Sequence, residues 1–595
     1  MSGKFEEKES PSSQPPEWST AEQPSTYIKP QARKLNDPAV RLEEYYYYAQ
    51  RTREIEKGYE SPKLAWRQIL SGKKEARNVQ EEQEAEIAQN VTNVNLTKKE
   101  NRIQISDQEW ENASRALRTA SWGAAFYLIT TDIIGPFGVG FALGTLGWGP
   151  GIALYTVFGF FAGYSGYLLW KVFMGLDSYQ FPVRNYGDMG FRTWGTILRH
   201  TTNILQALGL ILLLGQVTIQ FGQNISVVSK FRLCYIVCPL LFVIAGFMLT
   251  QIRTLKAYGL VANFSVWLNL LVIFMTMGFI SASPPNYSIA QLGSAGSAVD
   301  TATITPDAQG NYPPVIHYSG LPSENLVGSI NGLLSGVLGY AGAQLFVEFM
   351  AEMKRPNDFL KAMWGAQFFI YTVYMVYGCF VYYYQGQYSF QPSYQGVSVY
   401  GWQTAGNMIS LIAALIAAGL YGNIGVKVLY NNILMDLFNA PPLITKPGKI
   451  FYAALVPVWW STAFIIAAAI PDYVGFVSVM SASTLLNLTY TLPPLFALGF
   501  DIQKNAIRFQ QGEGFDPNTG EVRRDDWGVK RYIRGFFSGG PLQVAQNIWH
   551  VLYVLCSLSM CGLGMYAAIE GMIEVFKNPQ ITSFTCRSPL NLSPS

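Results

Sequence analysis

Long apolar runs dominate the chain after about residue 120, and short polar segments separate them. A helix needs about 20 consecutive apolar residues to cross the hydrocarbon core of a bilayer. Eleven runs approach or exceed that length, at about 122–145, 151–172, 198–222, 233–252, 257–280, 326–350, 362–384, 404–426, 450–470, 474–498 and 545–570. The pattern therefore predicts an all-α polytopic membrane protein with about 11 transmembrane helices.

The regions that flank these runs are polar. Residues 1–105 are rich in Glu, Lys, Gln, Ser and Pro, and such a segment cannot bury enough apolar surface to fold alone, so we predict a disordered cytoplasmic tail. Within it, residues 37–56 carry four consecutive tyrosines and could form a short helix or remain disordered. A capping-box pattern at Ser106-Asp-Gln-Glu109 predicts an amphipathic helix over 106–121. The membrane core then covers 122–570, and 571–595 forms a second tail.

Composition supports a membrane protein and excludes several other classes. Only 14% of the residues are charged and 50% are hydrophobic, whereas soluble proteins have roughly 25% charged residues. No basic stripe interleaved with aromatic residues suggests nucleic-acid binding. The three histidines lie far apart and no cysteine pair has metal-ligand spacing, so we expect no metal site, no cofactor and no enzymatic chemistry. Five cysteines fall in apolar runs and are interpreted as small apolar fillers: Cys234, Cys238, Cys379, Cys556 and Cys561.

The distribution of positive charge predicts the orientation in the membrane. Lys and Arg are retained on the cytoplasmic side. If the N-terminus is cytoplasmic, 19 of the 23 Lys and Arg residues after residue 118 lie in or beside internal loops and four lie in external segments. We therefore expect a cytoplasmic N-terminus and an extracytoplasmic C-terminus. The sequon at Asn286 then falls in an external loop and is a candidate glycosylation site.

Two of the spans contain residues that interrupt a helix. The first span carries Gly135, Pro136, Gly138 and Gly140, and the sixth carries glycines at 336, 339 and 342. Proline removes a backbone donor and clashes with the preceding turn. Interrupted helices at matching positions in two halves indicate a transporter site at the membrane midplane, although small residues can instead serve close helix packing.

An interrupted helix exposes backbone N–H groups at one new end and carbonyl groups at the other. An amino acid zwitterion carries the complementary pair of charges. We expect the substrate carboxylate at the N–H groups near Phe137, Gly138 and Val139, with Gly135 allowing close approach. The ammonium would meet the carbonyl groups of Gly339, Tyr340, Ala341 and Gly342.

Two acidic residues within spans are candidates for ion coupling. A carboxylate near the centre of a bilayer costs roughly 2.5–3.5 kcal/mol, so it usually faces a cavity and has a role. Asp132 lies about one turn before the first interruption, where it could contact the substrate ammonium or take up a proton. Glu348 lies beyond the second interruption and is a second proton-pathway candidate. Either carboxylate could instead be a satisfied packing group.

At these residues the chain resembles the amino acid/auxin permease family. The resemblance rests on the stretch from Asp132 to Gly151, on Gly339-Tyr-Ala-Gly342, on Glu352-Met-Lys-Arg-Pro-Asn-Asp-Phe-Leu-Lys-Ala362, and on Ile470-Pro471 and Leu492-Pro-Pro494. It covers roughly residues 110–570 and is most similar to filamentous-fungal neutral amino acid permeases. It implies a core of five plus five helices in an inverted repeat, one extra helix, and amino acid uptake driven by an ion gradient.

Some residues depart from the family pattern. Members often have a histidine after Tyr-Ala-Gly in the sixth helix, where this chain has Ala343-Gln344. They often carry Leu-Ser-Leu-Pro in the first helix, where this chain has Gly140-Phe-Ala-Leu143. The middle of the eighth span, 411–419, lacks the adjacent hydroxyl pair of sodium-coupled relatives. The proton gradient is therefore favoured over sodium as the driving force.

Together these observations predict a proton-coupled symporter for neutral amino acids, with the plasma membrane favoured over the vacuolar membrane. Its expected partners are the amino acid substrate and the lipid bilayer, and the sequence does not indicate what the N-terminal tail binds. The alternative is an amino acid sensor that keeps the transporter fold and signals through its long N-terminal tail. Both predict amino acid binding, and net flux of substrate distinguishes them.

Overall fold

The computed structural model describes residues 29–30, 36–57, 104–105, 118, 120–251, 255–292, 303–322, 326–438, 440–441, 446–577 and 582–591. Most of the helix predicted over 106–121, and most of the tail predicted over 1–105, lie outside these residues. Within the described part, nine helical segments are long and apolar enough to cross a membrane. They contain α5 (Trp122–Ile133) with α6 (Val139–Leu146), α7 (Trp148–Leu176), α9 (Thr196–Val228), α11 (Leu255–Ala282), α13 (Leu326–Gly339) with α14 (Phe346–Glu352), α15 (Phe359–Gln385), α16 (Tyr400–Val428), α18 (Lys446–Ala469) and α22 (Pro541–Phe576).

The two remaining expected spans are also helical. One is α10 (Val237–Thr250), which is apolar but shorter than the others. The other runs from α19 (Tyr473–Met480) to α20 (Leu492–Asn505) through two π-helical turns over 481–491. The predicted all-α polytopic fold is therefore confirmed, and each of the eleven expected ranges coincides with a helical segment.

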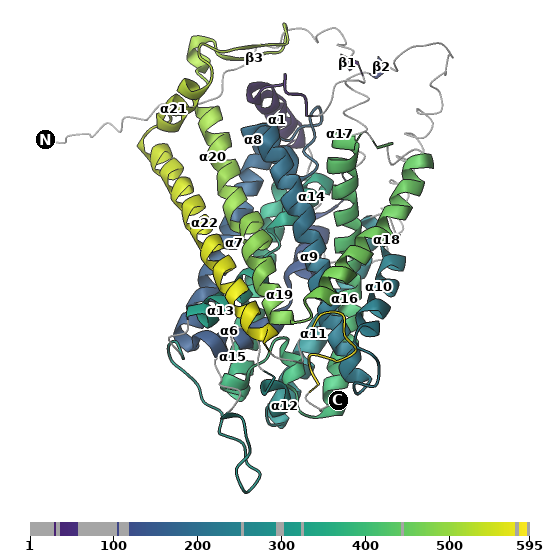
Figure 1. Ribbon diagram of the computed structural model, residues 1–595. Helices are drawn as coiled ribbons and strands as arrows, with labels where there is room; N and C mark the ends of the chain where they lie inside the picture. The colour runs from purple at the N-terminus through teal and green to yellow at the C-terminus, as the bar shows by residue number, and fades with distance from the viewer. Residues whose placement is uncertain are drawn as a thin grey trace, which may run out of the picture.

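Smaller elements lie at the two ends of the bundle (Figure 1). One end, which we call the α1 end, carries α1, α8, α21 and the β3–β4 hairpin; the opposite end, the α12 end, carries α12 and the C-terminal segment. Their bounds are α1 (Leu42–Lys57), α8 (Tyr186–Trp194), α12 (Tyr287–Ala290), α17 (Met435–Phe438), α21 (Val529–Phe537), β1 (Lys29–Pro30), β2 (Gln104–Ile105), β3 (Gly514–Asp516) and β4 (Glu521–Arg523). The strands pair antiparallel, β1 with β2 and β3 with β4.

Large apolar side chains lie on the outside of the bundle. Phe160, Trp267 and Phe368 are each more than half exposed. Apolar surface of this kind is stable against lipid tails, as in other spanning helices. On the inside, Gly246 of α10 packs against the fully buried Trp460 of α18, because a glycine lets two helices approach closely.

Residues 42–57 are an ordered helix, which corrects the prediction that this part of 1–105 is disordered. The helix α1 packs against α7 at the α1 end, and Tyr45 is 1% exposed with its ring edge-on to Phe181 at 5.1 Å. Of the two alternatives left open for this segment, the helix is right. The tyrosines supply the large apolar area that the rest of the tail lacks.

Buried ion pairs hold α1 in place. Arg53 Nη2 lies 2.7 Å from Asp177 Oδ2, and Arg118 Nη2 lies 2.8 Å from Asp177 Oδ1. At the other side of the helix, Glu43 Oε1 pairs with Arg531 Nη2 at 2.7 Å. These pairs connect α1 to the end of α7 and to α21, and they connect the end of α7 to the segment before α5.

A neighbouring carboxylate, Glu513, completes the charge cluster beside β3. Burial opposes its ionisation, but backbone N–H groups of Asp525 and Arg508 and the guanidinium groups of Arg534 and Arg531 outweigh that cost and lower the pKa of Glu513 to about 2. The carboxylate therefore stays charged throughout the neutral and mildly acidic range. Its contribution to stability is present above its unfolded pKa and is lost only as the pH falls through the lowered value.

We expect Arg53→Ala to release α1 from the bundle. Removing one partner of a buried ion pair costs up to about 3–5 kcal/mol when the other charge is left uncompensated. Asp177 would keep Arg118 and the N–H of Val183 as partners, but the ion pair that joins it to α1 would be lost. The measurement is the rate of proteolytic cleavage near α1 in the full chain, which should rise by on the order of tenfold or more. Arg51→Ala is the control, because Arg51 is exposed on the same helix. Equal cleavage rates in the two variants would contradict the ion-pair account.

The structure corrects one interpretation of the cysteines. Cys234 is joined by a disulfide to Cys586, 352 residues away. Cys586 belongs to the C-terminal segment, which lies at the α12 end of the bundle (Figure 1). The sequence predicts an apolar filler because Cys234 lies in an apolar run, and its disulfide partner is remote in the sequence. The other four predicted fillers, Cys238, Cys379, Cys556 and Cys561, are free thiols.

Candidate functional site

Both predicted helix interruptions are present. In the first span, α5 ends at Ile133, residues 134–135 are not helical, and a 3-10 turn over Pro136–Gly138 leads into α6. Proline has no N–H group and cannot continue the hydrogen-bond ladder. In the sixth span, α13 ends at Gly339, a turn covers 340–342, and a 3-10 turn over Ala343–Leu345 leads into α14. The confirmed fold therefore has broken helices in its first and sixth spans.

A single hydroxyl group joins the two interruptions. The Tyr374 hydroxyl on α15 accepts a hydrogen bond from the N–H of Gly135 at 3.2 Å. The same oxygen lies 2.5 Å from the carbonyl oxygen of Ile133 and 2.8 Å from that of Gly339, and it can donate its proton to one of them at a time. Tyr374 is fully buried. It therefore bridges the carbonyl ends of α5 and α13, a role that sequence reasoning missed.

The interruptions also approach each other closely in space. A Cβ atom added to Gly342 would lie 2.5 Å from side-chain atoms of Ile133 and 2.9 Å from Asp132 Oδ2. Real Cβ atoms do not tolerate such contacts, so the absence of a side chain at 342 is what allows this approach. Gly342 thus acts through packing rather than by lining the site.

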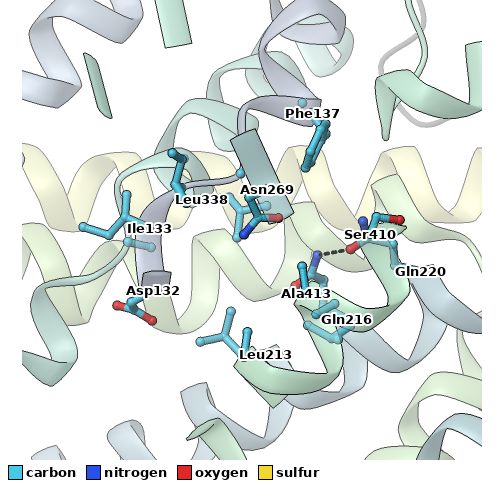
Figure 2. Close-up of a pocket in the computed structure, with 18 of the residues that line it drawn as sticks. Asp132, Ile133, Phe137, Leu213, Gln216, Gln220, Asn269, Leu338, Ser410 and Ala413 are labelled. Atoms are coloured by element: carbon cyan, nitrogen blue, oxygen red, sulfur yellow. Dashed lines mark hydrogen bonds between the residues drawn. The ribbon is translucent and has the colours of Figure 1, made fainter. Parts of the chain in front are cut away.

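A cavity of about 160 Å³ lies between the broken helices. This is far above the roughly 10–15 Å³ needed for one water molecule. Seven of the predicted substrate-binding residues line it: Asp132, Gly135, Phe137, Gly138, Val139, Gly339 and Ala341. Figure 2 shows Asp132 and Phe137 at this cavity together with side chains from other helices.

Three predicted site residues lie outside the cavity lining. Tyr340 is 1% exposed and packs on Tyr374, with ring centroids 5.4 Å apart. Gly342 contacts Asp132 as described above. Glu348 lies on α14, where its Oε1 accepts a hydrogen bond of 2.7 Å from Gln206 Nε2. The structure therefore does not bring Glu348 to the cavity with Asp132.

The Asp132 carboxylate is the one charged group that lines this cavity within the described residues. Its Oδ2 is buried and has no hydrogen-bond partner in the described part of the chain. Its backbone carbonyl accepts a bond of 3.2 Å from the Tyr421 hydroxyl. Buried charged atoms are normally paired, so an unpaired carboxylate oxygen here favours interaction with a ligand, a proton or water.

Sequence reasoning also missed the neutral polar side chains of the cavity. These come from α9, α11, α13, α16 and the loop before α16: Gln216, Gln220, Asn269, Ser335, Ser410 and Gln391. The signal available in the sequence was Gln216 and Gln220, which are spaced by four residues inside an apolar span. Polar residues within membrane helices usually face a cavity.

Gln391 reaches the cavity from the loop between α15 and α16. Its Oε1 accepts a hydrogen bond of 3.1 Å from Ser335 Oγ on α13. Its Nε2 would lie 2.7 Å from a Cβ atom added to Gly138. A loop residue therefore lies against Gly138 at the N–H end of the first interruption, and a side chain at 138 would require the Gln391 amide to move.

The candidate glycosylation site, Asn286, uses its side-chain amide in hydrogen bonds within the protein. Asn286 caps α12, and its Nδ2 donates hydrogen bonds to the carbonyl groups of Gln395 and Val397, both at 3.2 Å. An amide nitrogen has two hydrogens, and both are used here. Glycosylation at Asn286 stays a prediction that this folded geometry disfavours.

Comparison with known families decides the class of protein. The family described as "transmembrane amino acid transporter protein" matches residues 118–507. This range contains both broken helices and all the residues that line the cavity. The chain belongs to this family of amino acid transporters. The resemblance noted in the sequence is thereby confirmed.

Solved structures were also compared with this transporter. The manganese transporter of Eremococcus coleocola, in complex with an aromatic bis-isothiourea substituted compound, is 12% identical over 79% of this chain and 96% of its own, with a TM-score of 0.34. A mutant of the same manganese transporter is 13% identical over 82% and 99%, with a TM-score of 0.33. Likeness at this level carries no argument about function. No curated protein matches the sequence significantly.

Proposed function

We propose that this transporter moves neutral amino acids across a membrane by proton-coupled symport. The observation that carries the proposal is the cavity between two broken helices with Asp132 in its wall, whose Oδ2 has no hydrogen-bond partner in the described residues. The family supplies the substrate class, amino acids. That the substrates are neutral amino acids and that protons drive their transport are parts of our proposal.

The two helix breaks provide complementary ends for a zwitterion. The start of α6 offers the N–H groups of Phe137 and Gly138, where the substrate carboxylate would bind. The N–H of Val139, also predicted to bind it, donates to the carbonyl group of Pro136. The ends of α5 and α13 offer the carbonyl groups of Ile133 and Gly339, where the ammonium would bind beside Asp132. This refines the sequence prediction, which assigned the ammonium to the carbonyl groups of residues 339–342 and to Asp132, by adding the carbonyl group of Ile133.

Proton coupling is assigned to Asp132, since a proton or the substrate ammonium can neutralise its carboxylate. Glu348 is proposed as a second proton-pathway group. It lies outside the cavity, and its Oε2 is buried without a hydrogen-bond partner in the described residues. Gln206, which bonds Glu348, also donates to the carbonyl of Gln344 at 2.9 Å and thereby ties Glu348 to the segment that follows the second break.

For the orientation, we propose that the α1 end faces the cytoplasm. The positive charge of the loops at that end supports this. The Cys234–Cys586 disulfide at the other end also supports it, because disulfides persist in oxidising compartments. We place the protein in the plasma membrane rather than the vacuolar membrane.

One observation favours a second candidate function, an amino acid sensor. The tail helix α1 is bound to the bundle by specific buried ion pairs, so a change in the bundle could reach the tail. A sensor would bind amino acids without sustained flux.

The test is uptake of labelled amino acids by the full chain in proteoliposomes. We expect accumulation of neutral amino acids when the lumen is alkaline, and none with a sodium gradient at equal pH. Uptake driven only by sodium would contradict proton coupling. Binding without accumulation under any gradient would favour the sensor, and neither binding nor uptake of any amino acid would overturn the whole proposal.

A further inference from the structure

One side of the cavity is lined by neutral polar groups. Gln216 and Gln220 of α9, Asn269 of α11 and Ser410 of α16 lie there, and we call these four residues the amide pocket. Figure 2 shows Gln216, Gln220 and Ser410 well separated from Asp132, with Asn269 nearer the middle of the view. Three alanines of α16, at 413, 414 and 417, line the cavity beside Ser410 and leave room.

Hydrogen bonds hold most of the amide pocket in one arrangement. Gln216 Nε2 donates to the Tyr473 hydroxyl at 2.7 Å, and Gln220 Nε2 donates to the Tyr394 hydroxyl at 2.6 Å. Gln220 Oε1 accepts a longer bond of 3.4 Å from Gln216 Nε2. These bonds orient the two glutamine amides, so their positions do not depend on a ligand.

Asn269 is different from its neighbours. Its side-chain amide makes no hydrogen bond to any residue in the described part of the chain, although it lies in a membrane helix and lines the cavity. Within the same part of the chain, nothing donates to Gln216 Oε1. Both groups lie in the wall of the cavity and are not among the fully buried unpaired atoms of the described residues, so they are accessible to a ligand. A ligand that supplies both a donor and an acceptor can bond to both groups.

The charge of the residues that line the cavity further limits which substrate side chains can bind there. The one charged group among the described lining residues is Asp132, which the proposed function assigns to the ammonium or the proton. A charged substrate side chain would therefore lie in the cavity without a partner. An aliphatic side chain would leave Asn269 and Gln216 unpaired.

Resting on the proposed function, we infer that the amide pocket selects amino acids whose side chains are polar and uncharged. These are the side chains with an amide or a hydroxyl group: glutamine, asparagine, serine and threonine. A site built to hydrogen-bond a polar group discriminates against analogues that lack it far more strongly than an apolar pocket discriminates by size. The inference separates these substrates from the aliphatic neutral amino acids.

The first experiment compares nearly isosteric substrates in proteoliposomes. Threonine is matched with valine, and asparagine with leucine, so that size is held nearly constant while the polar group changes. Each is used unlabelled to compete with the uptake of a labelled neutral amino acid. We expect threonine and asparagine to compete at concentrations at least tenfold lower than their apolar partners. Equal competition within each pair would overturn the inference and leave the proposed function standing.

The second experiment assigns the preference to Asn269. In Asn269→Leu the side chain keeps the number and branching of its heavy atoms and loses its amide, so the threonine-to-valine ratio should fall toward one while valine uptake persists. Ser281→Ala is the control on the same helix, since Ser281 is exposed and bonds the backbone of its own helix. An unchanged ratio in Asn269→Leu would overturn the role of Asn269.

The two proposals fail in distinguishable ways. If the wild-type chain transports no amino acid, the proposed function fails and this inference fails with it. If it transports amino acids without a polar preference, only the inference fails. Should Asn269→Leu not fold, Asn269→Ala serves as the second variant, and the wild-type competition remains decisive.

Discussion

Asp132→Asn is expected to abolish uptake driven by a proton gradient while leaving membrane insertion intact. Asparagine has nearly the same shape as aspartate, so the cavity between the broken helices should persist. The amide cannot take up and release a proton, and it carries no charge to attract an ammonium group. Accumulation in proteoliposomes with an alkaline lumen should fall to background, and the remaining exchange of substrate should no longer depend on pH.

The control for this prediction is Asp358→Asn. Asp358 lies before α15 and pairs with the exposed Lys361 at 2.9 Å, so its loss should leave coupling unchanged. Undiminished proton-driven uptake in Asp132→Asn would remove Asp132 from the mechanism. Glu348→Gln would then become the variant to measure, because Glu348 is the other proposed proton group.

Tyr374→Phe is expected to weaken substrate binding strongly. The change removes only the hydroxyl that contacts Gly135, Ile133 and Gly339. Backbone groups left unpaired in the membrane cost about 1–3 kcal/mol each, and a factor of ten corresponds to about 1.4 kcal/mol. Without the hydroxyl, the ends of α5 and α13 lose the contact that fixes their carbonyl groups relative to each other, and misplaced binding groups weaken binding. We therefore expect the apparent affinity for substrate to fall by about tenfold, measured as the concentration that gives half-maximal uptake.

A matched control lies one turn away on the same helix. The Tyr371 hydroxyl bonds Thr156 at 3.0 Å on an exposed part of the bundle, so Tyr371→Phe should have little effect. If Tyr374→Phe bound substrate as well as the wild type, the breaks would be held by their own backbone geometry. The bridge between them would then have no part in binding.

The fold could be predicted because its main determinants are local. The length of the apolar runs sets the number of membrane helices. Pro136 and its neighbouring glycines end a helix without any contribution from distant residues. The turn at 340–342 could be predicted in the same way, from the glycines of the sixth span. The sequence prediction for α1 was weaker, because whether residues 42–57 fold depends on Asp177 and Arg531, which are distant in the chain.

The candidate site could be predicted only in part. The backbone of both breaks and Asp132 were found, because unusual residues in an apolar span are visible without a partner. Tyr374 was missed, since a tyrosine among other aromatic residues of one span gives no sign that its hydroxyl meets two other helices. Glu348 was grouped with Asp132 by its chemistry, yet packing places it against Gln206 and away from the cavity.

The features that could be predicted from the sequence depend on interactions between neighbouring residues, and those that could not depend on contacts between distant segments. Length, hydrophobicity and helix-breaking residues act over one or two turns, so the order of residues was enough to establish a membrane bundle with two interrupted spans. The bridge at Tyr374, the amide pocket and the Cys234–Cys586 bond join helices that are far apart along the chain. Only the packing of the folded chain brings those groups within bonding distance, and their spacing in the sequence does not indicate that they meet.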